Sequence, residues 1–170
     1  MLTKLIVRNF KRFDAVEIDL SEAVVFIGPN NSGKTTALQA LALWDAGCRQ
    51  WLAKRSGGKS EAAKAVTIGR KDLVALPLPA ANALWRDQKV REGYREEGKT
   101  KTRSLLIEII LEGRNAAVDW RWGFEFEYVS EEYFYCRPLR GEVNGLAPDL
   151  DQIARPAFLL PLGGMSLEEP

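Results

Sequence analysis

The order of apolar and polar positions predicts a β-rich chain with one long helix near its N-terminus. Residues 5–7 form a short apolar run, and residues 16–20 alternate apolar with acidic side chains. Alternation at period two predicts a half-buried strand. The continuous apolar run at 23–27 predicts a third strand, buried on both faces. These 28 residues therefore indicate three strands before the first glycine-rich loop.

A helix is predicted after Thr35. Apolar residues recur every three or four positions there, which indicates one buried face, made of Leu38, Leu41, Trp44, Cys48, Trp51 and Leu52. Gly47 weakens such a helix by about 1 kcal/mol relative to alanine. The stretch Ser56-Gly57-Gly58 indicates its end.

The middle of the chain has the weakest pattern. Residues 80–89 have helical character, and residues 86–103 carry seven basic and four acidic side chains. Charge runs of this kind are usually solvated, so we interpret this one as a loop or helix face rather than a nucleic-acid contact. Residues 56–104 are accordingly predicted to be a charged, partly helical insertion.

The region at 105–137 is predicted to be antiparallel β structure. Leu105, Ile107, Ile109 and Leu111 share one face of a strand. Residues 118–128 alternate large apolar with polar or small side chains, which indicates an antiparallel strand with one buried face. Residues 133–136 and 158–160 predict two further short strands.

Composition narrows the possible functions. A chain of 170 residues corresponds to about one domain, here taken as 1–170. Its 24 basic and 23 acidic residues give a net charge of +1, hence no global attraction to nucleic acid or anionic membranes. The lack of histidine and of any Cys-x-x-Cys pair excludes zinc sites and histidine-based triads. Without a long apolar segment or a signal-peptide pattern, we expect a cytoplasmic protein that has no membrane partner.

One motif carries chemistry. Residues 28–35, Gly-Pro-Asn-Asn-Ser-Gly-Lys-Thr, match the phosphate-binding P-loop pattern G-x-x-x-x-G-K-[ST] between a predicted strand and a predicted helix. Backbone N–H groups of such a loop point at a phosphate, and the helix dipole faces the same anion. Lys34 would stabilise phosphate charge in catalysis, and Thr35 would bind Mg²⁺. We take residues 28–55 as the P-loop and the helix that follows it. The nucleotide-binding residues predicted there are Asn30, Asn31, Ser32, Gly33, Lys34, Thr35 and Thr36.

The stretches 2–13, 16–20 and 25–35 resemble the N-terminal lobe of ABC-type ATPase heads, above all those of the SMC, RecF/RecN and OLD group of AAA-family proteins. The ending at 158–166 is similar to a strand and loop seen midway through some bacterial members. The resemblance implies an α/β P-loop NTPase fold. A mostly parallel core sheet would carry the P-loop and its helix, and residues 1–20 and 103–137 would form an antiparallel β-subdomain.

The resemblance also implies a function and further site residues. Such heads bind ATP with Mg²⁺, dimerise head to head around it, and act in DNA repair, chromosome maintenance or phage defence. The turn after the first strand approaches the base and ribose, which points to Lys11 and Arg12, while Phe13 is a core anchor. Gln152 is the nearest candidate for a glutamine that holds Mg²⁺ and water. Candidate DNA contacts are Lys99, Lys101 and Arg103, a small patch for nucleic-acid binding.

Two elements of an ATP hydrolase have no match in the sequence. No apolar strand ends in the Asp-Glu pair that holds Mg²⁺ and positions water, and no Leu-Ser-Gly-Gly-like signature is present. In ABC-type heads both lie in the C-terminal lobe. We therefore expect an incomplete head, whose partner is the missing C-terminal lobe and which turns over little ATP alone.

Three alternatives remain at this point. A small-molecule kinase or phosphotransferase would place a lid arginine over the phosphates, and Arg91, Arg95 or Arg103 are candidates. An ABC transporter ATPase would show an aromatic residue near the adenine. A non-enzymatic interaction module would retain a vestigial P-loop.

Overall fold

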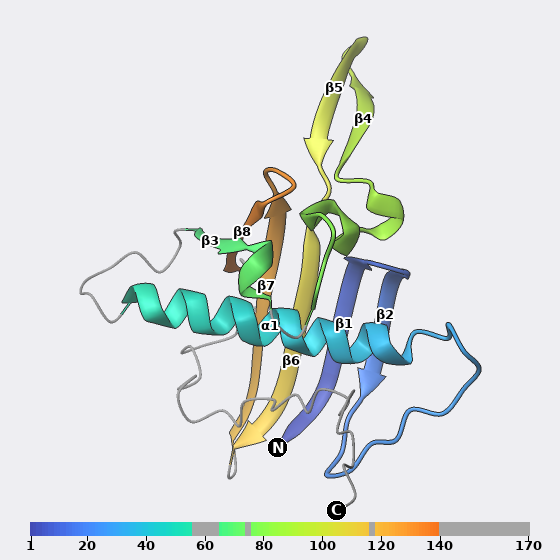
Figure 1. Ribbon diagram of the computed structural model, residues 1–170, viewed down its shortest axis with the longest axis vertical. Helices are drawn as coiled ribbons and strands as arrows, with labels where there is room; N and C mark the ends of the chain where they lie inside the picture. Colours follow the sequence, from blue (N-terminus) through green and yellow to red (C-terminus); the bar gives the residue numbers. More distant parts are fainter. Residues whose placement is uncertain (56–64, 74–75, 116–117, 140–170) are drawn as a thin grey trace, which may run out of the picture.

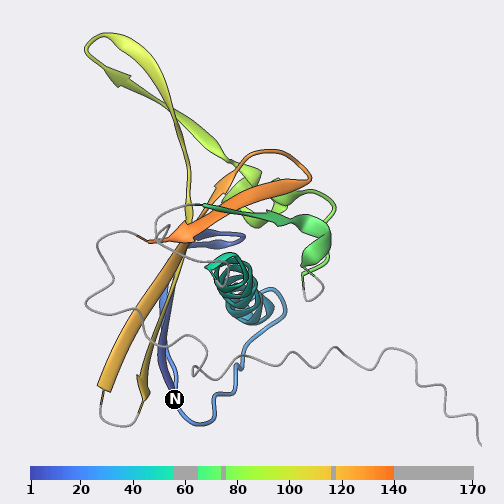
Figure 2. The same cartoon turned by 90° about the vertical axis from the view of Figure 1, so that its left-hand side faces the viewer.

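The computed structural model describes residues 1–55, 65–73, 76–115 and 118–139. Its frame is a six-stranded antiparallel sheet with one long helix, α1 (Lys34–Arg55), across one face (Figures 1 and 2). The strand order is β2-β1-β6-β7-β8-β3. The bounds are β1 (Leu2–Phe10), β2 (Phe13–Asp19), β3 (Val66–Gly69), β6 (Ile107–Asn115), β7 (Val118–Tyr128) and β8 (Tyr133–Pro138). Short 3-10 turns lie at Arg70–Asp72, Ala81–Leu84 and Arg86–Gln88.

The core lies between α1 and the sheet. Trp44 of α1 packs edge-on against Phe124 of β7, with ring centroids 5.7 Å apart. Trp51, two turns later, packs on Trp122 at 5.6 Å. The Trp44 indole N–H donates to the Trp122 carbonyl at 3.2 Å, so this buried polar group is satisfied. The aromatic residues predicted to line one face of β7 therefore form the surface against which α1 packs.

The predicted buried face of α1 is confirmed at Trp44, Cys48 and Trp51, and Leu41 and Leu52 are partly buried against the same core. Leu38, by contrast, is 47% exposed, and small residues fill much of the buried surface. The buried residues of the helix are Thr36, Ala37, Ala40, Ala42, Leu43, Trp44, Asp45, Gly47, Cys48 and Trp51. A Cβ on Gly47 would lie 2.9 Å from Cys136 Sγ and 3.3 Å from the Phe126 ring. The glycine that weakens the isolated helix thus allows close approach of helix and sheet.

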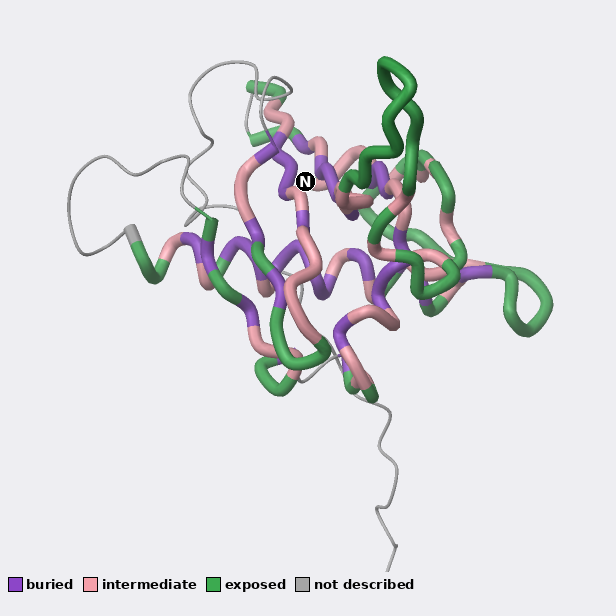
Figure 3. Tube along the Cα trace, turned by 90° about the horizontal axis from the view of Figure 1, so that it is seen from above, coloured by how far each residue is buried: buried purple, intermediate pink, exposed green. Residues whose placement is uncertain are grey.

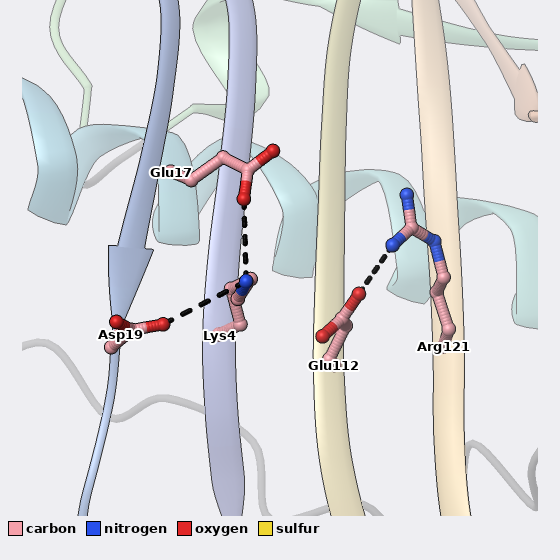
Figure 4. Close-up of polar contacts among 5 residues, drawn as sticks. All are labelled: Lys4, Glu17, Asp19, Glu112 and Arg121. Atoms are coloured by element: carbon pink, nitrogen blue, oxygen red, sulfur yellow. Dashed lines mark hydrogen bonds and ion pairs between the residues drawn. The ribbon is translucent and has the colours of Figure 1, made fainter.

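The outer face of the sheet, opposite α1, carries charges that are paired across strands. Lys4 of β1 contacts Glu17 at 3.2 Å and Asp19 at 3.8 Å, and Arg121 of β7 contacts Glu112 of β6 (Figure 4). The same pattern continues along the face in the pairs Arg8–Glu108, Arg114–Asp119 and Arg137 with Glu125 and Glu127. A second, small apolar cluster of Ile6, Ile110 and Leu139 is buried separately from the main core, so the predicted wet face is polar only in part.

The strands predicted at 16–20, 105–111, 118–128 and 133–136 are confirmed as β2, β6, β7 and β8 within a few residues. The strand predicted at 23–27 is wrong. Val25 is 79% exposed and Ile27 90%, and this segment joins no sheet. Every strand pair in the described residues is antiparallel, so the predicted parallel core sheet is not found there. A strand is buried on both faces only when neighbouring strands and covering layers enclose it. In the described residues no strand pairs with 23–27, and only Phe26 packs against the core.

The prediction for 86–103 is confirmed in that the charge run is largely exposed, but a loop or helix face is wrong for most of it. Most of this charge run forms a β-hairpin, β4 (Arg91–Glu96) and β5 (Lys99–Ser104), joined by Glu97 and Gly98. Both turn residues have positive φ, 51° and 76°, as a type I′ hairpin turn requires. The predictions at 56–58, 158–166 and Gln152 lie outside the described residues.

Candidate functional site

The P-loop lies where the chain enters α1. The helix begins at Lys34, and the Ala37 N–H donates to the Gly33 carbonyl at 2.9 Å. A surface cavity of about 210 Å³ opens at this point. It is lined by Arg12, Asn30, Asn31, Ser32, Gly33, Lys34, Thr35 and Thr36. The structure thus brings all seven predicted loop residues to one cavity and adds Arg12 from the β1–β2 turn.

Gly33 is required by the geometry of the loop. Its φ of 99° lies in the left-handed region, which side chains disfavour. A Cβ at this position would also lie 2.7 Å from Cε1 of Phe13, the first residue of β2. Phe13, predicted only as a core anchor, therefore also supports the loop. The motif itself holds no signal for this contact, which arises because the β1–β2 turn folds against the start of α1.

The Lys34 side chain turns back over its own loop. Its Nζ donates to the carbonyls of Gly28 at 2.6 Å and Pro29 at 2.7 Å. A bound phosphate would compete with these two carbonyls for the ammonium group. The first turn of α1 holds no acidic residue, so nothing in it offsets the positive end of the helix dipole. The cavity therefore combines a cation and a helix N-terminus, which together suit an anion.

The two basic residues of the β1–β2 turn, Lys11 and Arg12, contact different parts of the molecule. Arg12 Nη1 donates to the Asn31 side-chain oxygen, which fixes the guanidinium on the rim of the cavity. Lys11 Nζ donates instead to the Gln39 side-chain oxygen on α1 at 2.7 Å, and Lys11 is not among the lining residues. Partial burial lowers the pKa of Lys11. Arg12 is thus positioned beside a phosphate site, whereas contact of Lys11 with a base or ribose stays a prediction.

The described residues that line the cavity suit phosphates but include no group that could activate water. Ligand pockets that enclose a whole small molecule measure about 300–1,000 Å³, so this cavity of about 210 Å³ is smaller than a pocket for a whole nucleotide. Among the described residues, none in the lining carries a carboxylate, and Thr35 is an exposed residue whose hydroxyl a cation could meet. Mg²⁺ suits this arrangement, since it is commonly held by few protein ligands together with substrate phosphates. No cluster of acidic or thiol ligands is found elsewhere in the described part of the chain.

Comparison with known proteins agrees with this part of the molecule. Residues 1–47 match the family described as the AAA ATPase domain. The match spans β1, β2, the P-loop and the first half of α1, and relates the chain to AAA-family P-loop ATPases, which bind ATP with Mg²⁺. No curated protein matches the chain. Among the helices that the structure describes, none is both long and apolar enough to cross a membrane.

Proposed function

We propose that this chain is the nucleotide-binding lobe of an SMC/RecF/OLD-like ATPase. It binds the phosphates of Mg-ATP at residues 30–36, and hydrolysis requires carboxylates from a second lobe. The observation that carries the proposal is the cavity lined by the predicted loop residues, Lys34 among them, where α1 begins. The match of residues 1–47 to an ATPase family supports the same chemistry.

The exposed segment 23–27 supports a partner lobe. Val24, Val25 and Ile27 are all exposed, and they form an apolar segment that directly precedes the P-loop and joins no described sheet. Burying an apolar side chain of this size stabilises by about 1.5–3 kcal/mol, so this segment favours association with further strands. Such strands would form the parallel sheet expected from the resemblance and bring acidic residues toward Thr35. In the parent protein we expect ATP-driven pairing of two heads and a role in DNA repair, chromosome maintenance or phage defence.

The kinase alternative gains no support. Its candidate lid residues, Arg91, Arg95 and Arg103, lie on the β4–β5 hairpin and are absent from the cavity lining. Arg103 is already paired with Glu92.

Thermal unfolding with and without Mg-ATP tests the proposal. A ligand at 100 times its dissociation constant stabilises by about 2.7 kcal/mol, which raises Tm by several degrees. We expect this rise in Tm in the unsubstituted chain, and we expect the Lys34→Ala variant to lose it. Lys54→Ala is the matched control, because Lys54 is an exposed lysine near the far end of the same helix.

Two further outcomes complete the test. Thr35→Ala should retain the shift with ATP and EDTA but lose the extra shift that Mg²⁺ provides. A parent chain that shows no shift at millimolar Mg-ATP, or an equal shift in Lys34→Ala, would contradict nucleotide binding and favour an interaction module with a vestigial loop.

A further inference from the structure

The β4–β5 hairpin is an arm that projects beyond the end of the sheet (Figures 1 and 2). It is exposed over nearly all of its length (Figure 3). Six residues per strand correspond to roughly 20 Å. An isolated two-stranded hairpin is only marginally stable in water. Its prominence therefore calls for a reason other than the stability of the domain.

The two faces of the arm differ in chemistry. The register places Glu92, Tyr94 and Glu96 opposite Arg103, Lys101 and Lys99 on one face, which we call the paired face. Here Arg103 contacts Glu92, and Lys101 contacts Glu96 at 2.5 Å. The Arg103 guanidinium also lies 5.8 Å from the Tyr94 ring centroid. Charge on this face is largely satisfied within the hairpin.

The other face, which we call the arginine face, holds Arg91, Gly93 and Arg95 opposite Ser104, Thr102 and Thr100. It carries two guanidinium groups and three hydroxyls, with no carboxylate and no apolar side chain. Within the described residues, Arg91 and Arg95 have no hydrogen-bond or ion-pair partner. On the outer face of the sheet, by contrast, Lys4 and its neighbouring cations all meet carboxylates (Figure 4).

We propose that the arginine face binds the phosphate backbone of double-stranded nucleic acid. Arginine, serine and threonine are residue types that contact phosphates in such complexes. A two-stranded ribbon fits the major groove, which is about 12 Å wide. Arg91 and Arg95 are four residues apart on one strand, roughly 14 Å, so the two guanidinium groups can reach separate phosphates. A membrane surface is disfavoured, because the face offers no side chain to insert among lipids.

This assignment differs from the contacts that sequence alone suggested. Lys99, Lys101 and Arg103 lie on the paired face, and two of them are neutralised by glutamates. The proposal does not depend on the P-loop, so its failure would leave the nucleotide site untouched.

Fluorescence anisotropy of a labelled 20-base-pair duplex, titrated with the full chain, tests the proposal. We expect binding at low salt whose affinity falls steeply as salt rises. The double variant Arg91→Gln/Arg95→Gln should weaken binding about tenfold. It should also reduce the salt slope, which is the slope of log K against log salt concentration, by about 1.8, because each lost phosphate contact reduces that slope by about 0.9. Neither arginine stabilises the fold through a contact in the described residues, so Tm should not change.

Two charge-matched controls isolate the face. Lys101→Gln/Arg103→Gln removes two charges from the paired face, and Lys54→Gln/Lys71→Gln removes two exposed lysines outside the hairpin. Both should keep the parent salt slope. The second control remains informative if the first unfolds the arm. Equal weakening in the arginine and lysine double variants, tighter binding to phosphatidylserine vesicles than to the duplex, or no binding by the parent would overturn the proposal.

Discussion

Two apolar segments of this protein differ in their burial. Residues 107–111 form the first half of β6, and Ile107, Ile109 and Leu111 are buried beneath α1. Residues 23–27 have a comparable apolar content, yet Val25 and Ile27 are the most exposed large apolar side chains among the described residues. The difference is that β6 pairs with β1 on one edge and β7 on the other.

An apolar segment in the sequence therefore indicates that burial would be favourable, but it does not indicate which elements bury the segment. The buried segment obtains its neighbours from within residues 1–139, whereas 23–27 finds none among the described strands. In this comparison the exposed segment lies directly beside the P-loop. Any element that covered it would also approach the phosphate cavity, so binding and association are expected to be linked.

The largest expected change in the free energy of unfolding comes from a substitution in the buried core between α1 and the sheet. Phe124→Ala removes a fully buried ring between Trp44 and Trp51 and should lower the free energy of unfolding by about 3–5 kcal/mol. Ile27→Ser should change it by less than about 0.5 kcal/mol. Urea denaturation measures both. A large loss in Ile27→Ser would show that 23–27 is packed in solution.

A smaller effect is expected where helix and sheet touch most closely. Gly47→Ala improves helix propensity by about 1 kcal/mol, but its methyl group meets Cys136 and Phe126, and overpacking costs about 1–3 kcal/mol. A modest net loss of stability should result. Gly93→Ala on the hairpin is the control, since its Cβ would meet nothing nearer than 3.9 Å. Stabilisation by Gly47→Ala would show that the helix sits further from the sheet.

The smallest effect appears only at alkaline pH. Burial raises the pKa of the Cys136 thiol well above its usual range. Above the ordinary thiol pKa of about 8.5 the unfolded chain loses this proton while the folded chain keeps it, so stability falls as pH rises. Cys136→Ala should show a shallower fall in urea stability between neutral and alkaline pH than the parent. Identical slopes would mean that the thiol is accessible to water.

Several features were predictable from local pattern. The aromatic alternation of β7 indicated its buried face, and residues 28–35 indicated a phosphate loop before a helix begins. The hairpin has a local signal as well: threonines alternate with basic residues over 99–103, after a Glu-Gly pair suited to a turn. The charge density of this segment indicates its exposure, and the alternation indicates its strands.

Other features depend on contacts that no local pattern encodes. Nothing near Gly33 in sequence specifies that Phe13 packs against it, and the divergence of Arg12 toward Asn31 and Lys11 toward Gln39 follows from how the β1–β2 turn meets α1. Likewise, whether Arg91 or Arg103 is neutralised depends on cross-strand register.

The sequence by itself determined the elements whose cause is local: the phosphate loop, the long helix and the alternating strands. Tertiary structure decided which apolar segments are buried, which residues join Lys34 at the cavity and which cations lack a partner. The physical reason is that periodicity and turn chemistry act over a few residues, whereas burial and charge compensation depend on neighbours brought together from distant parts of the chain.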